Sequence, residues 1–417
     1  MRRLLILVAL VVVGLDWGGT LRSAMAREVL RAKPRQCQRL GGRVRAAEIR
    51  LNVNPDGVRN QKRFDKASRK YATRCVHLNE IQVLGSHNSY HIRPLEPLWQ
   101  ALLDLLPIFY QLDYTHIPLD EQFSTQGVRQ IELDVWADPA GGLYANRPVM
   151  SLFDLPTASG VPALDQPGIK VLHIADIDFQ STCFTFIDCL MTIKTWSDGH
   201  PGHLPIAVLV EAKHDQSPDI YNLGFVIPVP WNTVQFDALD AEIRSVFPPE
   251  RLITPDDVRG DFPTLEDAVL EYGWPTLGEA RGKVLFMLDN GGGFRTDYLA
   301  GHPSLAGRVL FTSADPGNDD AAFIKLNNSK NDPIAERVAA GYVIRTRADA
   351  DTEEARDNDT STRDAALASG AQWVSTDYPV PNPAPGFTDY FVEIPDGHPA
   401  RCNPVNAPFG CRSTALE

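Results

Sequence analysis

The chain has 417 residues and a formal net charge of −13, with 40 Lys and Arg against 53 Asp and Glu. This acidic balance argues against a nucleic-acid partner and against simple electrostatic adhesion to anionic lipid, because both need a basic footprint. A chain of this length and moderate hydrophobicity is expected to bury one large core. We also expect it to be a monomer.

Residues 1–26 are predicted to be a signal peptide. Arg2 and Arg3 precede the apolar run from Leu4 to Val13, and Ala24-Met25-Ala26 has the small-x-small pattern of a cleavage site. The apolar run is short for a membrane span, so a membrane anchor is the weaker interpretation. We therefore expect a secreted protein that begins near Arg27.

All six cysteines follow the predicted cleavage site, and an even number in an exported chain predicts disulfides. Zinc is the alternative, but the sequence has no C-x-x-C pair and no Cys/His cluster. Six cysteines allow about fifteen pairings. The simplest joins neighbours in sequence: Cys37–Cys75, Cys183–Cys189 and Cys402–Cys411.

Residues 27–78 are predicted to be a polar, basic and partly helical lead-in, residues 79–380 one catalytic domain, and residues 381–417 a tail pinned by a disulfide. Short apolar runs without strict alternation recur in the central part, as in strands buried on both faces of a parallel sheet. Helical stretches between several runs predict right-handed βαβ units, and eight units favour a TIM (β/α)8 barrel. Phe323–Leu326 is an alternative strand. The eight runs are Ile81–Gly85, Gln130–Val135, Val171–Ile174, Ile206–Val210, Val284–Leu288, Val309–Thr312, Tyr342–Ile344 and Trp373–Ser375.

Polar side chains collect where these strands end, and the carboxyl ends of barrel strands build active sites. Glu132 and Asp134 lie two apart on one strand, so they share a face. Such a pair is unfavourable unless a cation or hydrogen bonds satisfy it. Adding Asn88 and Glu211 gives one amide oxygen and three carboxylates, a set that suits calcium better than zinc. The alternative is a structural ion-pair network with Arg129.

Two histidines at the same strand ends, His87 and His173, are then free for proton transfer or for stabilising charge on a phosphate. Lys213 shares a face with one carboxylate, and it either binds a substrate phosphate or only neutralises the carboxylates. Arg345 and Arg347 follow a predicted strand. They are expected either to contact an anion in the pocket or to lie on the surface.

The segment Ser86-His87-Asn88-Ser89-Tyr90, followed by Glu132-Leu133-Asp134-Val135-Trp136, resembles the opening of the phospholipase C catalytic barrel. In that family the pattern is Ser-His-Asn-Thr-Tyr, then Glu-Leu-Asp with an aromatic residue two places on. The compact calcium-dependent bacterial and fungal branch is the most similar, also through Val171-Leu172-His173 and Ser375-Thr376-Asp377-Tyr378-Pro379. The resemblance extends over about Asn79 to Pro379.

The resemblance implies a calcium-dependent phosphodiesterase that acts on phospholipid as a peripheral protein at a membrane surface. The inositol 2-hydroxyl would attack the phosphodiester and release diacylglycerol and a cyclic inositol phosphate. The lysine pair that reads ring phosphates in the multi-module relatives has no match, so plain phosphatidylinositol is the expected substrate. The implied ligands are Asn88, Glu132, Asp134 and Glu211, and the implied catalytic residues are His87 and His173.

Two alternatives remain open. A glycerophosphodiester phosphodiesterase on the same barrel also has a Glu-x-Asp strand and two histidines, but its first motif is His-Arg-Gly where this chain has His87-Asn88-Ser89. A calcium-dependent lipid-binding protein without turnover would not need the histidine pair.

Two apolar stretches after predicted strands are candidates for contact with the membrane. The first runs from Pro94 to Tyr110, and its helix is as well explained by packing on the barrel. The second runs from Leu223 to Trp231. In the second stretch, Phe225 and Trp231 are expected to insert into the interface.

Overall fold

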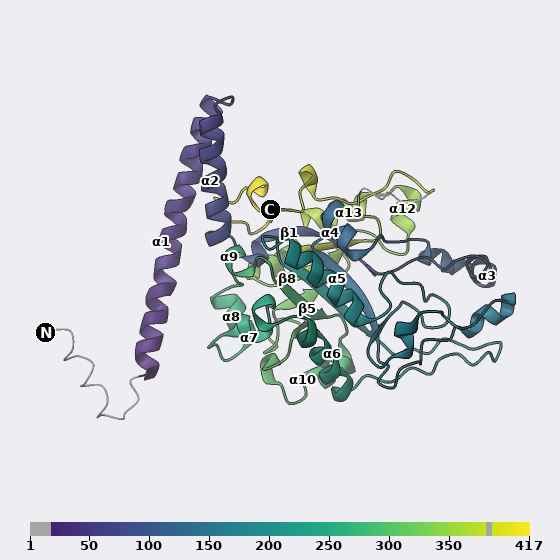
Figure 1. The fold of residues 1–417 in the computed structure, drawn as a ribbon. Helices are drawn as coiled ribbons and strands as arrows, with labels where there is room; N and C mark the ends of the chain where they lie inside the picture. Colours follow the sequence, from purple (N-terminus) through teal and green to yellow (C-terminus); the bar gives the residue numbers. More distant parts are fainter. Residues whose placement is uncertain (1–17, 381–385) are drawn as a thin grey trace.

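The computed structural model describes residues 18–380 and 386–417, with side chains from residue 34 onward. One sheet contains all the strands of this part of the chain, and its centre is a parallel barrel (Figure 1). The strands are β1 Ile81–Ser86, β2 Gln130–Trp136, β3 Lys170–Val171, β4 Ile206–Lys213, β5 Val284–Leu288, β6 Leu310–Thr312, β7 Phe323–Lys325, β8 Val343–Arg347, β9 Trp373–Thr376 and β10 Ala400–Cys402.

The barrel strands follow the order β6-β5-β4-β2-β1-β9-β8-β7, and neighbours in this order are parallel. One parallel bridge, from Ser313 to Phe323, closes the ring between β6 and β7. Strands β1, β2 and β5 are buried along their whole length, as expected for a sheet covered on both faces. The predicted α/β barrel is therefore confirmed in a nearly closed form.

One predicted barrel strand is wrong. The run Val171–Ile174 contributes only the end of β3, which pairs antiparallel with the end of β2 outside the barrel order. The strand cannot continue because Ile174 and Asp178 exchange two backbone hydrogen bonds of 2.9 Å in a tight turn. The eighth barrel strand is β7, within the alternative run Phe323–Leu326.

Helices cover the outside of the barrel (Figure 1). Local sequence sets where several begin: the Thr185 side chain accepts the Asp188 N–H at the start of α5, and the Asn232 side chain accepts the Val234 N–H at the start of α6. The α-helices are α1 Gly18–Val53, α2 Val58–Cys75, α3 Leu98–Leu105, α4 Leu119–Thr125, α5 Phe186–Gly199, α6 Thr233–Val246, α7 Pro255–Arg259, α8 Leu265–Glu271, α9 Leu277–Ala280, α10 Gly292–Leu299, α11 Ile334–Ala340, α12 Glu353–Asp357 and α13 Ser361–Ala368.

Helices α1 and α2 form an antiparallel hairpin beside the barrel (Figure 1). Its base packs into the main core through Leu40, Val44 and Tyr71. Because α2 ends shortly before β1 begins, the hairpin lies at the amino-terminal end of the barrel strands. Of the predicted signal peptide, residues 1–17 lie outside the described residues, and α1 begins within the remainder. No helix in the described part of the chain is both long and apolar enough to cross a membrane.

The three predicted disulfide pairings are confirmed. One bond joins the two helices of the hairpin, one joins a loop to the start of α5, and one pins the tail, whose strand β10 pairs antiparallel with β1. The bonds are Cys37–Cys75, Cys183–Cys189 and Cys402–Cys411.

Candidate active site

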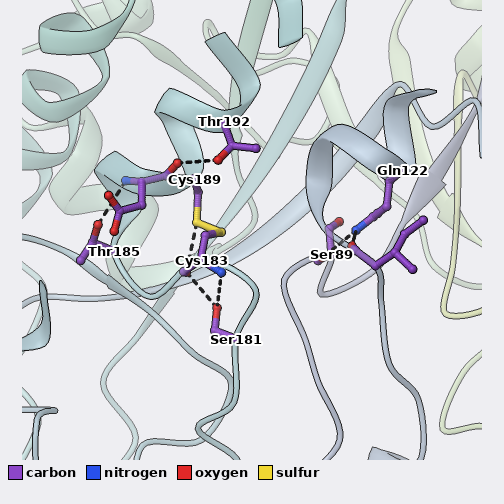
Figure 2. Close-up of a disulfide and its surroundings, with 9 residues drawn as sticks. Ser89, Gln122, Ser181, Cys183, Thr185, Cys189 and Thr192 are labelled. Carbon is purple, nitrogen blue, oxygen red and sulfur yellow. Dashed lines mark hydrogen bonds between the residues drawn. A yellow bond between two sulfur atoms is a disulfide. The ribbon is translucent and has the colours of Figure 1, made fainter. Parts of the chain in front are cut away.

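Strand β1 leads directly into the first loop of the site. It ends one residue before His87, and Asn88 follows with a left-handed backbone (φ 43°), which Asn tolerates better than most residues. Ser89 holds the loop in place. Its Oγ accepts the Glu132 N–H at 2.8 Å, and its carbonyl oxygen accepts a hydrogen bond from Gln122 Nε2 at 2.7 Å (Figure 2).

Three carboxylates meet at the carboxyl ends of β2 and β4. Asp134 is paired in register with Glu211, and Glu132 lies two residues before Asp134 on the same face of β2. Carboxylate oxygens of the three residues lie within 4.8 Å of one another. Burial raises the pKa of both Glu132 and Asp134, and the neighbouring carboxylates raise it further. The ionised cluster therefore needs added positive charge.

The residues present fit a hard cation. Asn88 donates from Nδ2 to the Tyr114 hydroxyl at 2.9 Å, but its buried Oδ1 accepts no hydrogen bond from the described residues. The Asp134 oxygens accept none within that part of the chain either, although the Lys213 ammonium lies 3.3 Å from Asp134 and 3.0 Å from Glu211. Unsatisfied amide and carboxylate oxygens grouped in this way are the ligands that calcium prefers.

Two arginines near the cluster have structural partners. Arg129, the alternative partner of the carboxylates, pairs with Glu417 instead. Arg345 is 2 % exposed, pairs with Glu132 and donates to Asn327 Oδ1 at 2.7 Å. Arg345 therefore sits in the barrel interior beneath the ligand set, where it offsets one of the buried charges.

His87 is held between a carboxylate and a guanidinium. Its Nδ1 lies 2.8 Å from Asp377 Oδ1, and its Nε2 lies 3.1 Å from Arg347 Nη1. Because an arginine side chain only donates, Nε2 accepts, and the ring proton is on Nδ1 facing Asp377. Burial and the nearby Arg347 guanidinium keep the pKa of His87 well below its usual value. The ring is therefore neutral, with a lone pair on Nε2.

His173 follows β3 and is held by a different carboxylate. Its Nδ1 lies 2.7 Å from Asp178 Oδ2, and the same oxygen lies 2.8 Å from His91 Nε2. Burial would raise the pKa of Asp178, but the two histidines lower it to about 2. The charged Asp178 therefore fixes the orientation of the His173 ring through Nδ1.

The disulfide Cys183–Cys189 anchors the loop that carries His173 (Figure 2). On the other side of this loop, the Thr182 N–H donates to the Tyr90 carbonyl at 2.8 Å. The loop is therefore clamped between α5 and the loop that follows β1.

His87 and His173 line one cleft of about 400 Å³, together with Asn88, Glu211 and Lys213. Arg347 also lines it, whereas Arg345 is not among the residues of the cleft wall. The anion contact at Arg345 therefore stays a prediction, and of the two arginines on β8 it is Arg347 that reaches the cleft wall.

The apolar border of the cleft differs from the expectation. Trp231 is only 5 % exposed, and its indole N–H donates to the Lys213 carbonyl at 3.0 Å. Phe225 packs against a small cluster that includes Leu98 and Leu102. Trp231 therefore serves the fold, and Phe225 is partly buried against that cluster. The first apolar stretch supplies the exposed border instead, because Ile108 is 56 % exposed and lines the cleft.

Sequence reasoning missed the two carboxylates that hold the histidines. Asp377 lies within the Ser375-Thr376-Asp377-Tyr378-Pro379 motif, which was a usable signal. Asp178 lies in an ordinary run five residues after His173, and nothing in the sequence marks it.

Comparison with known proteins identifies one family. The family model described as phosphoinositide phospholipase C, Ca2+-dependent, matches residues 76–404. The fold is similar to calcium-dependent phosphoinositol-specific phospholipase C structures from the Gram-negative bacterium Pseudomonas sp., one of them described as a myoinositol complex, at 18 % identity and a TM-score of 0.48 over 79 % of this chain and 96 % of theirs. A Ca2+-dependent phosphatidylinositol-specific phospholipase C from Streptomyces antibioticus is 17 % identical. Its TM-score is 0.45 over 73 % of this chain and 95 % of that one. A comparison with curated proteins found no match.

We predict that Asp134→Asn weakens calcium binding about tenfold or more and removes most turnover, because it takes one charge from the ligand set without changing its size. Calorimetric titration with calcium and circular dichroism measure binding and fold. Asp120→Asn, an exposed aspartate of α4, is the control. Normal turnover of Asp134→Asn in limiting calcium would show that the ligand set is wrong.

Proposed function

The chain belongs to the Ca2+-dependent phosphoinositide phospholipase C family, and we propose that it cleaves phosphatidylinositol at a membrane surface to diacylglycerol and a cyclic inositol phosphate. As a member of this family it is a phosphodiesterase that uses calcium. One observation carries the proposal: two histidines, each held by a buried carboxylate, face the same cleft as part of the oxygen ligand set. Proton transfer and neutralisation of phosphate charge can therefore occur at one place.

The proposed reaction exchanges one ester bond for another. The inositol 2-hydroxyl attacks phosphorus, the bond from phosphorus to the glycerol oxygen breaks, and a proton is placed on that oxygen. When bound at Asn88, Glu132, Asp134 and Glu211, calcium supplies positive charge that lowers the hydroxyl pKa and offsets charge on the phosphate. Later attack by water would open the cyclic product.

The two histidines are assigned different roles because their surroundings differ. His87 has an unprotonated Nε2, which suits it to accept the 2-hydroxyl proton, and Asp377 then stabilises the imidazolium. His173 is assigned the opposite role, with its ring held through Nδ1 by Asp178. Its Nε2 makes no hydrogen bond within the described part of the chain, so it is available to protonate the glycerol oxygen.

Two cations complete the proposed phosphate site. Burial would lower the pKa of Lys213, but Asp134 and Glu211 raise it above its usual value, so the ammonium stays charged. A metal ion on the same carboxylates would leave this ammonium free to pair with the phosphate. Arg347 also stays charged, because burial lowers its pKa less than Asp377 and its other acidic neighbours raise it.

The proposed place of action is outside the cytoplasm. The three disulfides support it because such bonds persist in oxidising compartments. The signal-peptide pattern of residues 1–26 supports it independently. Sequencing the amino terminus of the exported protein tests the predicted start near Arg27.

We predict that the wild-type chain releases diacylglycerol from phosphatidylinositol vesicles with calcium, and that excess chelator lowers the rate about a hundredfold or more. Glycerophosphodiesters assayed in parallel should be poor substrates. Faster turnover of glycerophosphodiesters would favour the alternative enzyme. Calcium-dependent vesicle binding without product would favour a lipid-binding protein.

We predict that His87→Ala and His173→Ala each lower the rate by about 10²- to 10⁴-fold while calcium binding persists, as expected for proton-transfer groups. A substrate with a better leaving group than glycerol should restore rate only to His173→Ala, because the proton on the leaving oxygen then matters less. His200→Ala, at the end of α5, is the control. Near-normal activity of either variant removes that residue from the mechanism.

We propose that the first apolar stretch contacts the substrate membrane. Leu105 and Leu106 are 47 % and 53 % exposed beside the cleft-lining Ile108. Apolar side chains at such a border can enter the lipid interface without a basic patch.

We predict that Leu105→Ser with Leu106→Ser lowers turnover on vesicles by about tenfold and spares a soluble short-chain substrate, because only the interfacial step loses apolar area. Met191→Ser with Leu270→Ser is a matched control, since these side chains are 47 % and 46 % exposed away from the cleft. Equal losses on both substrates would mean that the border serves the fold or the pocket.

A further inference from the structure

The α1–α2 hairpin is basic although the chain is acidic. Residues 34–75 contain 12 Lys and Arg against 3 Asp and Glu, whereas residues 76–417 contain 22 against 48. All the basic side chains of this segment are exposed, and none forms an ion pair with a described residue. They are Arg35, Arg39, Arg43, Arg45, Arg50, Arg59, Lys62, Arg63, Lys66, Arg69, Lys70 and Arg74.

The few acidic groups of the hairpin do not neutralise this charge. Glu48 is occupied by Arg412 from the tail at 2.6 Å, and Asp65 accepts a hydrogen bond from Gln61 at 2.7 Å. Asp56 is exposed at the turn. The charge of the hairpin is therefore largely uncompensated within the described part of the molecule.

Seven of these cations lie on α2 and the other five on α1. Those of α2 are on its outer face. Its inner face is buried through residues such as Ser68, Tyr71 and Cys75. On the outer face, like charges follow one another at helical spacing, as in Lys66 and Lys70, and such pairs destabilise an isolated helix. An external anion would relieve this repulsion.

The tip of the hairpin adds an independent observation. Ile49, Val53 and Val58 are 55 %, 81 % and 68 % exposed where α1 ends and α2 begins. Single exposed apolar residues are ordinary, but these three lie close together in sequence around the projecting turn of the hairpin, beside Arg50 and Arg59 (Figure 1). Apolar side chains flanked by Lys and Arg are the pattern of helices that enter an anionic lipid interface.

We propose that the tip of the α1–α2 hairpin binds an anionic lipid bilayer. The hairpin lies at the amino-terminal end of the barrel strands. The cleft and its apolar border lie at the carboxyl ends, since His87, Lys213 and Arg347 line the cleft. The tip is thus a second lipid-contacting surface, separate from the one that presents substrate. A soluble polyanion, or the acidic barrel of a second copy, would use the charge but leave the apolar tip without a purpose.

The test is sedimentation of the full chain with phosphatidylcholine vesicles, with and without phosphatidylglycerol, in chelator and without phosphatidylinositol. These conditions remove substrate and metal, so the outcome does not depend on the proposed activity. Wild type should bind the anionic vesicles at low salt and be released by high salt. A charge variant that combines Lys62→Gln, Arg63→Gln, Lys66→Gln and Lys70→Gln should bind these vesicles at least about tenfold more weakly.

A second variant, Val53→Ser with Val58→Ser, keeps the charge and should also bind several-fold more weakly. Both variants differ from wild type only within the hairpin, so any difference in binding reports on it, and both should keep wild-type turnover of a soluble substrate. Leu105→Ser with Leu106→Ser is the control that should still bind.

Equal binding to neutral vesicles, or a charge variant that binds like wild type, would overturn the proposal. Unchanged binding of Val53→Ser with Val58→Ser, together with competition by polyphosphate, would assign the surface to a soluble polyanion instead.

Discussion

Three carboxylates grouped at one end of a parallel barrel, two of them buried, are the constraint on which the rest of the site depends. Carboxylates withdrawn from water are costly unless positive charge lies beside them. The barrel supplies that charge from strands on both sides of β2: Arg345 on β8 reaches Glu132, and Lys213 at the end of β4 reaches Asp134 and Glu211. Neither fully satisfies the cluster, because the Asn88 amide oxygen and the Asp134 carboxylate still accept no hydrogen bond from the described residues. This remaining deficit is what suits the site to a divalent cation.

The same rule of paired charge separates the two histidines. Asp377 and Asp178 are both buried beneath a histidine ring, but their second partners differ. Asp377 is shared with the Arg347 guanidinium, which also donates to His87 and so disfavours a charged ring. Asp178 is shared only with another imidazole, that of His91. Two His–Asp pairs of the same composition therefore have different hydrogen-bond surroundings in one cleft.

Sequence patterns predicted the features that are set by residues near one another in the chain. They missed the contacts between side chains that are far apart in the sequence. Seven of the eight apolar strand runs, the Glu132 and Asp134 spacing and the neighbouring disulfides are local features, and the structure contains them. Val171–Ile174 looked like a barrel strand because its composition is apolar, but the backbone pairing of Ile174 with Asp178 ends it at once. Asp377 lies 290 residues from His87, so no spacing rule could join them. Trp231 was expected on the surface because a pattern of apolar residues in a loop does not reveal that an indole N–H is used internally.

The net charge of the chain shows why an average can mislead about surfaces. A value of −13 suggested a molecule that anionic surfaces repel, yet it is the sum of a strongly acidic barrel and a strongly basic hairpin. Charges in water at physiological salt are screened over about 8–10 Å. The hairpin projects from the barrel (Figure 1). Its local field is therefore set by residues such as Arg50, Arg59 and Lys62, and only weakly by the total. Whether a protein adheres to an anionic surface depends on the charge within one screening length of the contact, and that quantity can have the opposite sign to the charge of the whole chain.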